Sequence, residues 1–301
     1  MKQLIDEFSK RKLAYTEHEP MSRHTTFKIG GEARLMVFPH SAEEVSFVVQ
    51  KCRECGVRCL TVGNGSNLLV ADEGIDACVM LLGKGFDDVR LLDETTIYAE
   101  AGATLMKVCA FALEHSLTGL EFAYGIPGSC GGAAFMNAGA YGGEMKDVLY
   151  RCDHIDANGN AGCLENETLG LSYRHSAYYD NGCTVTGLYL RLENGDQAAI
   201  KAKMQDLIGR RREKQPLEYP SAGSTFKRPE GYFAGALIEE CGLKGASVGG
   251  AAVSTKHAGF VINTGGATCK DVLDLCAMVH DTVLREKGVA LEMEIRVTKE
   301  G

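Results

Sequence analysis

Gly125-Ile-Pro-Gly-Ser-Cys-Gly-Gly-Ala-Ala-Phe-Met-Asn-Ala-Gly-Ala-Tyr-Gly-Gly143 holds seven glycines in nineteen residues, whereas the whole chain has 36 in 301. Each glycine costs conformational entropy on folding, so a globular protein seldom accepts so many unless its backbone must approach something closely. A low-complexity linker would explain the glycines but not the interleaved Ile126, Phe135, Met136 and Tyr141. We therefore expect the backbone of this segment to approach a ligand.

A second glycine-bearing loop, Gly63-Asn64-Gly65-Ser66-Asn67, lies between two apolar, strand-like runs. Its glycines allow consecutive N–H groups to turn inward as an anion nest, and its other three side chains add donors. It is not a P-loop, because no Gly-Lys-Ser/Thr follows, and it lacks the third glycine of a dinucleotide fingerprint. A simple tight turn is the alternative. Together the two loops predict a nucleotide cofactor whose pyrophosphate meets the backbone.

Three of the six prolines, Pro216, Pro220 and Pro229, fall in the fourteen residues 216–229. Proline fixes φ and removes a backbone donor, which excludes a regular helix or a central strand here. The result is a stiff loop that presents Ser224, with Lys227 and Arg228 close behind. Such a loop can aim a hydroxyl at an anionic ligand. The alternative is a proline-rich connector with an ordinary surface serine.

The C-terminal residues 290–298 alternate in polarity, as a strand with two different faces does. One face is apolar, and the other carries Glu292, Glu294 and Arg296. Glu294 and Arg296 are then neighbours about 7 Å apart along the polar face. This face is a candidate for acid–base chemistry, although a solvated surface would look the same.

Composition excludes several classes of protein. The chain has 32 basic and 40 acidic residues, a net charge of −8, which argues against a nucleic-acid partner but not against an anionic small molecule. The N-terminus has no apolar run of signal-peptide length, and no stretch approaches the ~20 apolar residues of a membrane span. We therefore expect a soluble, cytoplasmic protein with no membrane association, and no obligatory protein partner is evident.

The twelve cysteines are interpreted as reduced thiols that serve as small hydrophobic residues. Cys52-x-x-Cys55-x-x-x-Cys59 resembles a metal-binding spacing, but the chain has no second C-x-x-C pair. Cys52 also lies on the apolar face of a helix that is expected to begin after Ser41 and to stop at Gly56. We expect no metal site.

Local patterns predict short strands mixed with a few amphipathic helices. The strands are expected at residues 58–62, 78–82, 96–100 and 187–192, and the helices at 105–115, 197–213 and 268–287. Thr268 and Asp271 have capping-box spacing, and Gly288 follows as a stop. Because a regular βαβ rhythm is missing, the pattern favours the α+β class over a doubly wound sheet.

Five motifs in one order establish a resemblance to a known family. They are the glycine-rich segment and Glu144, the loop VGNGSNLL, the tetrad Ser172-Tyr173-Arg174-His175, the block PSAGSTFKRP and the ending LEMEIRV. In this combination the chain resembles the UDP-N-acetylenolpyruvoylglucosamine reductases over nearly its whole length, from Thr25 to Val297. The spacing after Arg174 is short and resembles the second type of the family, which lacks an inserted tyrosine-bearing loop.

The resemblance implies a three-lobed α+β protein. Residues 1–85 and 86–200 would form the two lobes of a FAD-binding region of the vanillyl-alcohol-oxidase (PCMH) type, and 201–301 a C-terminal α+β substrate domain. It also implies non-covalent FAD and NADPH as co-substrate. The reaction would be the reduction of UDP-N-acetylglucosamine enolpyruvate to UDP-N-acetylmuramate, a step of peptidoglycan synthesis that supports cell-wall biogenesis, cell shape and cell division.

The resemblance assigns roles to particular residues. Arg174 would hold the substrate carboxylate, and Ser224 would donate the proton. Glu294 matches the carboxylate that the family has at this position, and when protonated it would hydrogen-bond to the developing enolate. Lys227, Arg228 and Arg296 would bind the substrate. The residues expected to bind the cofactor are Gly63, Asn64, Gly65, Ser66, Asn67, Gly125, Ile126, Pro127, Gly128, Ser129, Gly131, Gly132, Ala133, Asn137 and Gly139.

Two other functions deserve comparison. A different flavin enzyme of this fold would keep both glycine loops but would have no reason to keep Arg174, Ser224 and Glu294 together. A flavin- or nucleotide-binding module without catalysis would not need a proline-braced serine.

Overall fold

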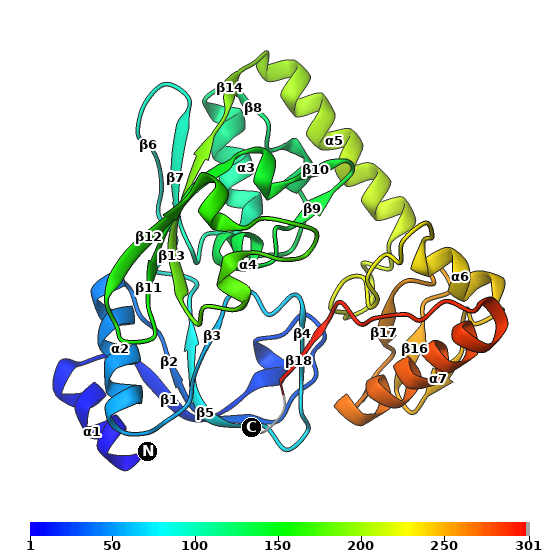
Figure 1. Cartoon of the computed structure of the whole chain (residues 1–301), viewed down its shortest axis with the longest axis horizontal. Helices are drawn as coiled ribbons and strands as arrows, with labels where there is room; N and C mark the ends of the chain where they lie inside the picture. The colour runs from blue at the N-terminus through cyan, green and yellow to red at the C-terminus, as the bar shows by residue number, and fades with distance from the viewer. Residues whose placement is uncertain (299–301) are drawn as a thin grey trace. The chain divides into compact units, whose positions relative to one another are not determined.

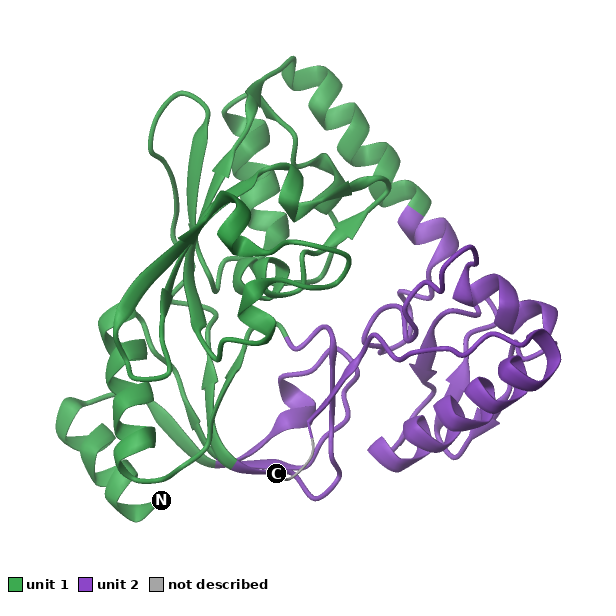
Figure 2. Ribbon diagram, viewed as in Figure 1, with its two compact units in different colours: residues 1–17, 35–64, 77–210 green, residues 18–34, 65–76, 211–301 purple. Residues whose placement is uncertain are grey.

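The structure, a computed structural model, describes residues 1–298 and has helices and mostly antiparallel sheets (Figure 1). Two compact units divide the chain (Figure 2). The first unit comprises residues 1–17, 35–64 and 77–210, and the second comprises 18–34, 65–76 and the chain from 211 on. The helices are α1 (Lys2–Arg11), α2 (Ala42–Glu54), α3 (Leu105–Glu114), α4 (Cys130–Phe135), α5 (Gln197–Lys214), α6 (Ala234–Glu240) and α7 (Cys269–Lys287).

The strands are short, and most of them form small sheets. Their bounds are β1 (Tyr15–Pro20), β2 (Glu32–Val37), β3 (Cys59–Val62), β4 (Leu68–Val70), β5 (Ile75–Leu81), β6 (Val89–Leu91), β7 (Thr96–Glu100), β8 (Leu117–Thr118), β9 (Gly139–Ala140), β10 (Gly143–Glu144), β11 (Leu149–Ile155), β12 (Ala161–Glu165), β13 (Thr184–Arg191), β14 (Glu193–Asn194), β15 (Ser247–Val248), β16 (Ala251–Val253), β17 (Val261–Asn263) and β18 (Arg296–Thr298). One sheet has the strand order β1-β2-β5-β3, and its β3 and β5 are parallel.

The largest sheet belongs to the first unit and has the order β12-β11-β13-β7-β6 with antiparallel neighbours. Helix α4 packs against β7 and β13 (Figure 1). Ala134 of the helix and Ala99 and Leu188 of these two strands are fully buried. This core gives the glycine-rich segment a rigid base.

Helix α2 shows why local signals predict helices well. Its N-cap is Ser41, whose hydroxyl accepts a hydrogen bond from the backbone N–H of Glu44, and Gly56 follows the helix with φ 63°. Cys52 is 1% exposed on the apolar face, as the periodicity predicts. Among residues 1–298 no group of three or more metal-ligating side chains is arranged to hold an ion.

The second unit contains a three-stranded sheet, β15-β16-β17, against which α7 packs. Helix α7 has the predicted capping box, in which the Thr268 hydroxyl accepts from Asp271 N–H and the Asp271 carboxylate accepts from Thr268 N–H. Its end is marked by Gly288 with φ 69°. Within the described part of the chain, no helix is both long and apolar enough to cross a membrane.

The structure refines the expectation for the glycine-rich segment. Residues 125–143 were expected to be loop, but they contain helix α4 and the β9–β10 hairpin. Ser129 caps the helix, with its hydroxyl 3.4 Å from the Gly132 nitrogen. Tyr141 and Gly142 both have positive φ, which is typical of a two-residue hairpin turn. Short helices rich in glycine carry little periodicity, so the pattern did not reveal α4.

Candidate functional site

The two glycine loops meet within the first unit. The Asn64 side chain donates a hydrogen bond to the Pro127 carbonyl at 3.2 Å. A Cβ atom at Gly63 would lie only 2.0 Å from the Ser129 Oγ atom, which caps α4. Glycine at position 63 is therefore required by the close approach of the α4 cap.

The same loop offers backbone donors for an anion. Among the described residues, 1–298, no hydrogen bond uses the backbone N–H of any residue from 63 to 67 as donor. Ser66 adds a hydroxyl to this run of amides. A run of unused N–H groups in a glycine turn matches the chemistry of a diphosphate, so these residues fit a nucleotide cofactor.

Several of the other glycines pack against protein. A Cβ at Gly131 would lie 2.9 Å from that of Ala101, and a Cβ at Gly139 would lie 2.7 Å from that of Glu144. Tight packing within the unit therefore accounts for part of the glycine density that the sequence analysis assigned to a ligand. The remaining expected cofactor residues occupy the irregular segment before α4 (Gly125, Ile126, Pro127 and Gly128) and its first turn (Gly132 and Ala133). Their contacts with a cofactor stay a prediction.

Cys130 lies in the first turn of α4 and is completely buried. Burial raises the pKa of its thiol to about 12. The thiolate is the nucleophilic form of cysteine, so this side chain is a poor nucleophile at neutral pH.

Arg174 lies in a tight turn of the first unit. Ser172 and His175 form both backbone hydrogen bonds of an isolated β-bridge, at 3.1 and 3.2 Å. Arg174 has φ 55°, a left-handed conformation that costs roughly 1–2 kcal/mol for a residue other than glycine. Its guanidinium carbon lies 5.1 Å from the centre of the Tyr173 ring. The backbone thus presents the arginine in a strained conformation.

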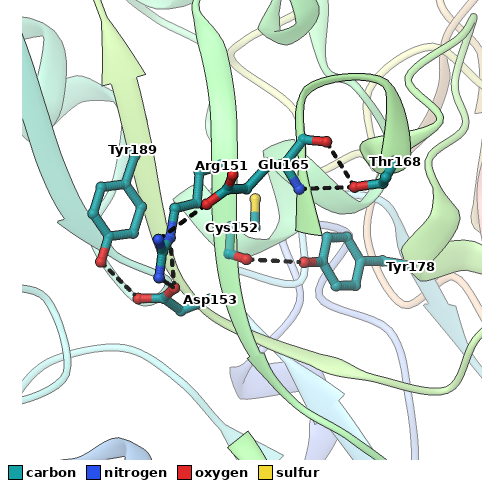
Figure 3. A network of polar contacts seen from close by, with 7 residues as sticks. All are labelled: Arg151, Cys152, Asp153, Glu165, Thr168, Tyr178 and Tyr189. Atoms are coloured by element: carbon teal, nitrogen blue, oxygen red, sulfur yellow. Dashed lines mark hydrogen bonds and ion pairs between the residues drawn. The ribbon is translucent and has the colours of Figure 1, made fainter. Parts of the chain in front are cut away.

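The residues before this turn are bound to the large sheet (Figure 3). The Arg151 guanidinium on β11 bridges Asp153 at 2.9 Å and Glu165, the last residue of β12, at 3.0 Å. Thr168 then donates to the Glu165 carbonyl at 2.6 Å and accepts from the Glu165 N–H. This fixes the 3₁₀ turn Asn166–Leu169 a few residues before Arg174.

The residues after the turn are fixed by Tyr178, in the 3₁₀ turn Ala177–Tyr179 (Figure 3). Its hydroxyl donates to the Cys152 carbonyl at 3.4 Å and lies 3.1 Å from the His154 Nδ1 atom. Burial raises the pKa of Tyr178, which keeps the hydroxyl protonated as a donor. Both flanks of the Arg174 turn therefore depend on β11.

In the second unit, the loop that carries Ser224 is braced by its neighbour. Thr225 is 1% exposed; its backbone N–H donates to the Gly259 carbonyl and its hydroxyl accepts from the Val261 N–H, both at 2.8 Å. Residues 216–229 form no helix or strand apart from an isolated bridge at Phe226, as the prolines predict. Ser224 itself is partly exposed at the surface of this stiff loop.

The structure brings the serine loop and the C-terminal segment together. The Glu294 N–H donates to the Thr225 carbonyl, and the Lys227 N–H donates to the Glu292 carbonyl, both at 2.8 Å. Asn67, from the glycine loop 63–67, joins them through a hydrogen bond from its side chain to the Glu294 carbonyl at 3.2 Å. Three segments far apart in the sequence thus meet within one unit.

The cationic side chains of this region have partners in the protein. Lys227 forms an ion pair with Glu292, and the Arg228 guanidinium lies 4.0 Å from the centre of the exposed Phe233 ring. Surface ion pairs are weak, about 0–1 kcal/mol, so Lys227 can exchange its partner for a ligand. Arg296 begins β18 and is exposed.

Sequence reasoning missed Thr225 and the contact between Asn67 and Glu294, although it singled out Asn67 as a cofactor residue. Both residues make tertiary hydrogen bonds that have no local signal. The sequence also gives no sign of the left-handed conformation of Arg174, because arginine does not favour that conformation.

Comparison with known proteins identifies relatives of this chain. Residues 215–298 match the model for the C-terminal domain of UDP-N-acetylenolpyruvoylglucosamine reductase, and residues 33–161 match a FAD binding domain. Proteins named UDP-N-acetylenolpyruvoylglucosamine reductase are 48% identical in Syntrophomonas wolfei, over 94% of both chains, and 51% identical in Clostridium perfringens, over 94% of this chain and 92% of the relative.

Solved structures agree. The UDP-N-acetylenolpyruvylglucosamine reductase of Thermus caldophilus superposes with a TM-score of 0.81 at 35% identity, covering 95% of this chain and 99% of that one. Alkyldihydroxyacetonephosphate synthase is 17% identical with a TM-score of 0.50, over 64% of this chain and 41% of its own, and so shares the fold alone. The predicted fold class is confirmed: an α+β protein with a FAD-binding region of the vanillyl-alcohol-oxidase type.

Proposed function

Because the chain belongs to the UDP-N-acetylenolpyruvoylglucosamine reductase family, and is an FAD-dependent oxidoreductase of peptidoglycan synthesis, we propose the following reaction. NADPH supplies the electrons, and UDP-N-acetylglucosamine enolpyruvate is reduced to UDP-N-acetylmuramate. We include in this proposal the cytoplasmic location and the three lobes, 1–85, 86–200 and 201–301.

FAD fits the glycine loops, since residues 63–67 present a run of unused backbone donors. When bound, FAD would supply the hydride chemistry, with NADPH as the source of the hydride and the terminal enolpyruvyl carbon as its acceptor from flavin N5. The loops would hold its diphosphate by backbone N–H groups, and the buried Cys130 would leave it without a covalent bond to the protein. The protein then has to orient the substrate, to stabilise the negative charge that develops on it and to donate a proton to it.

Arg174 stabilises the charge that develops on the substrate. Hydride addition pushes electrons toward the carboxylate and creates an enolate, so a cation there binds the transition state more strongly than the ground state. A planar guanidinium matches a planar carboxylate. The strained turn of Arg174 supports this role, because strain of this kind persists where the surrounding structure fixes a functional side chain.

Ser224 donates the proton to the carbon next to the carboxylate. An alcohol is a weak acid, and the donation works because the acceptor is a strongly basic enolate carbon. Glu294, when protonated, hydrogen-bonds to the developing enolate. The observation that carries the proposal is the pairing of their two segments, in which the Glu294 N–H donates to the carbonyl of Thr225, the residue after Ser224.

Lys227, Arg228 and Arg296 provide positive charge for the diphosphate and the carboxylate of the substrate. Their positions support this role, since Lys227 and Arg228 follow Ser224 in the same loop and Arg296 follows Glu294 in the same segment. The proposal includes NADPH and the sugar nucleotide as the molecules that the protein binds.

An anaerobic titration tests the proposed function. The purified protein should be yellow, and one equivalent of NADPH should bleach its flavin absorbance. UDP-N-acetylglucosamine enolpyruvate should then restore the absorbance without oxygen, whereas UDP-N-acetylglucosamine should not. If the sugar nucleotide failed to reoxidise a flavin that NADPH had reduced, another substrate would have to be sought.

A further inference from the structure

The turn that carries Arg174 needs an anchor, because its backbone is strained. Asn137, with φ 44°, is a second left-handed residue in the same unit and is completely buried. It lies two residues after α4, within the glycine-rich segment and 37 residues before Arg174. Two left-handed residues far apart in the sequence are thus linked by hydrogen bonds.

The Asn137 side chain makes three hydrogen bonds, all within the first unit. Its amide nitrogen donates to the Ser172 carbonyl at 2.9 Å and to the Glu144 carboxylate at 2.6 Å. Its amide oxygen accepts from the Lys146 N–H at 2.9 Å. Both donors and the acceptor are thereby engaged, so this amide serves the protein framework.

The bond to Ser172 acts directly on the turn. The Ser172 carbonyl also accepts the His175 N–H, the bond that closes the turn around Arg174. Both lone pairs of this carbonyl are therefore used, one by the turn itself and one by Asn137. Removing Asn137 would leave the turn free to relax its left-handed residue.

A second anchor lies on the other side of the turn. Ser176 is completely buried, and its hydroxyl donates to the Phe135 carbonyl at 2.6 Å. Phe135 is the last residue of α4, two residues before Asn137. The turn is thus attached at Ser172 and at Ser176 to one short stretch of chain.

We propose that Asn137 is a positioning residue for the reaction, which holds the Arg174 guanidinium in place through the Ser172 carbonyl, with Ser176 as a second anchor. This inference rests on the proposed role of Arg174. It also changes the expected role of Asn137, which the sequence analysis placed in the cofactor site. Because Asn137 lies only two residues after α4, the same short segment connects the candidate cofactor loop to the proposed catalytic cation.

Two variants remove the anchors without forcing a new conformation. Asn137→Gly deletes the amide and tolerates a positive φ. Ser176→Ala deletes one hydroxyl from the buried site. The matched control is Ser46→Ala, which removes a similar bond from a serine to a backbone carbonyl, that of Gly159, elsewhere in the unit.

The measurement is the rate at which the enolpyruvyl substrate reoxidises the NADPH-reduced flavin in a stopped-flow instrument. Ser176→Ala should slow it roughly 3- to 10-fold, as expected for one hydrogen bond. Asn137→Gly should slow it roughly 10- to 100-fold, because several bonds are lost and small misplacements are costly. Ser46→Ala should stay within about twofold, since a single bond that lies elsewhere does not orient the arginine.

Both anchor substitutions are then repeated in an Arg174→Ala background. If the anchors act through Arg174, the two substitutions should slow reoxidation less than about twofold in the Arg174→Ala background. Such non-additive effects are expected of residues that act through one another. A role in stability alone would leave their effects unchanged in that background and would overturn the inference. Loss of FAD from Asn137→Gly, with normal reoxidation in Ser176→Ala, would also overturn it.

The Arg174→Ala variant distinguishes a failure of the proposed role of Arg174 from a failure of the positioning role of Asn137. Near-normal reoxidation in this variant would remove the proposed role of Arg174, and with it the basis of the inference. Slow reoxidation in Arg174→Ala with full anchor effects on top would leave the proposed function intact and refute only the positioning role of Asn137.

Discussion

Replacing Gly63 with alanine should weaken FAD binding while leaving the rest of the fold in place. The added Cβ would lie 2.0 Å from the Ser129 Oγ atom and 3.0 Å from the Ser129 Cβ atom. Ser129 is the N-cap of α4, so rotating its hydroxyl away gives up a bond to the Gly132 N–H. The alternative is to move the two glycine loops apart.

The expected magnitude follows from these distances. An ordinary contact begins near 3.4 Å, so the added Cβ and the Ser129 Oγ atom must move apart by about 1.4 Å. Overpacking of this kind costs about 1–3 kcal/mol. Losing the cap alone costs about 1 kcal/mol. The apoprotein can relax by separating the loops, whereas in the proposed site bound FAD would need them together. The penalty therefore falls on the complex, and FAD should bind roughly 5- to 150-fold more weakly.

Titration of the apoprotein with FAD, followed by quenching of flavin fluorescence, measures the affinity. Gly209→Ala on the exposed side of α5 is the control, because no atom lies within 4 Å of its added Cβ. A second change, Ser129→Gly, removes both clashing atoms and should restore much of the affinity in the double variant. Affinity within twofold of the original in Gly63→Ala, or strict additivity in the double variant, would refute the close approach of the two loops.

Three further predictions concern the cofactor, the kinetics and the pH dependence of stability. Acid precipitation should release all the flavin into the supernatant, because Cys130 is buried; flavin in the pellet would contradict non-covalent binding. If NADPH and the enolpyruvyl substrate share one site, initial rates should give parallel double-reciprocal lines. Intersecting lines would exclude a shared site. Burial lowers the pKa of His154, although Asp156 and Asp153 oppose the shift, so stability should fall as pH drops below about 6.5. Below that pH the unfolded chain binds a proton at His154 that the folded chain does not bind. The urea midpoints at pH 7.5 and pH 5.5 should therefore differ less in His154→Gln than in the original protein. An equal difference in the two proteins would show that His154 is not involved.

Local signals in the sequence predicted the helices whose ends are set by their own residues. Ser41 and Thr268 cap α2 and α7 as expected, and the helix predicted at 105–115 is found as α3. Strand β11 was missed. Its Arg151 and Asp153 look like surface residues in the sequence, whereas in the sheet they are paired with each other and with β12.

The candidate site was predictable only in part. The proline spacing identified a stiff loop around Ser224, but nothing local indicates that Thr225 braces it or that Glu294 pairs with it. Asn137 shows the same limit, since an asparagine among glycines looks like a ligand contact, and nothing local indicates that its amide donates to the Ser172 carbonyl next to the Arg174 turn. Bonds between distant segments decide such roles, and a single sequence does not encode them in a readable pattern.

The most direct test of the account measures both half-reactions of Ser224→Ala in a stopped-flow instrument. Ser221→Ala, in the same loop, is the matched control. NADPH should bleach the flavin of Ser224→Ala at close to the normal rate, because this half-reaction does not use the serine. Reoxidation by the enolpyruvyl substrate should be at least ~100-fold slower, the low end of what a positioned general acid contributes. Equal slowing of both half-reactions, or near-normal reoxidation, would contradict the role of Ser224 as proton donor.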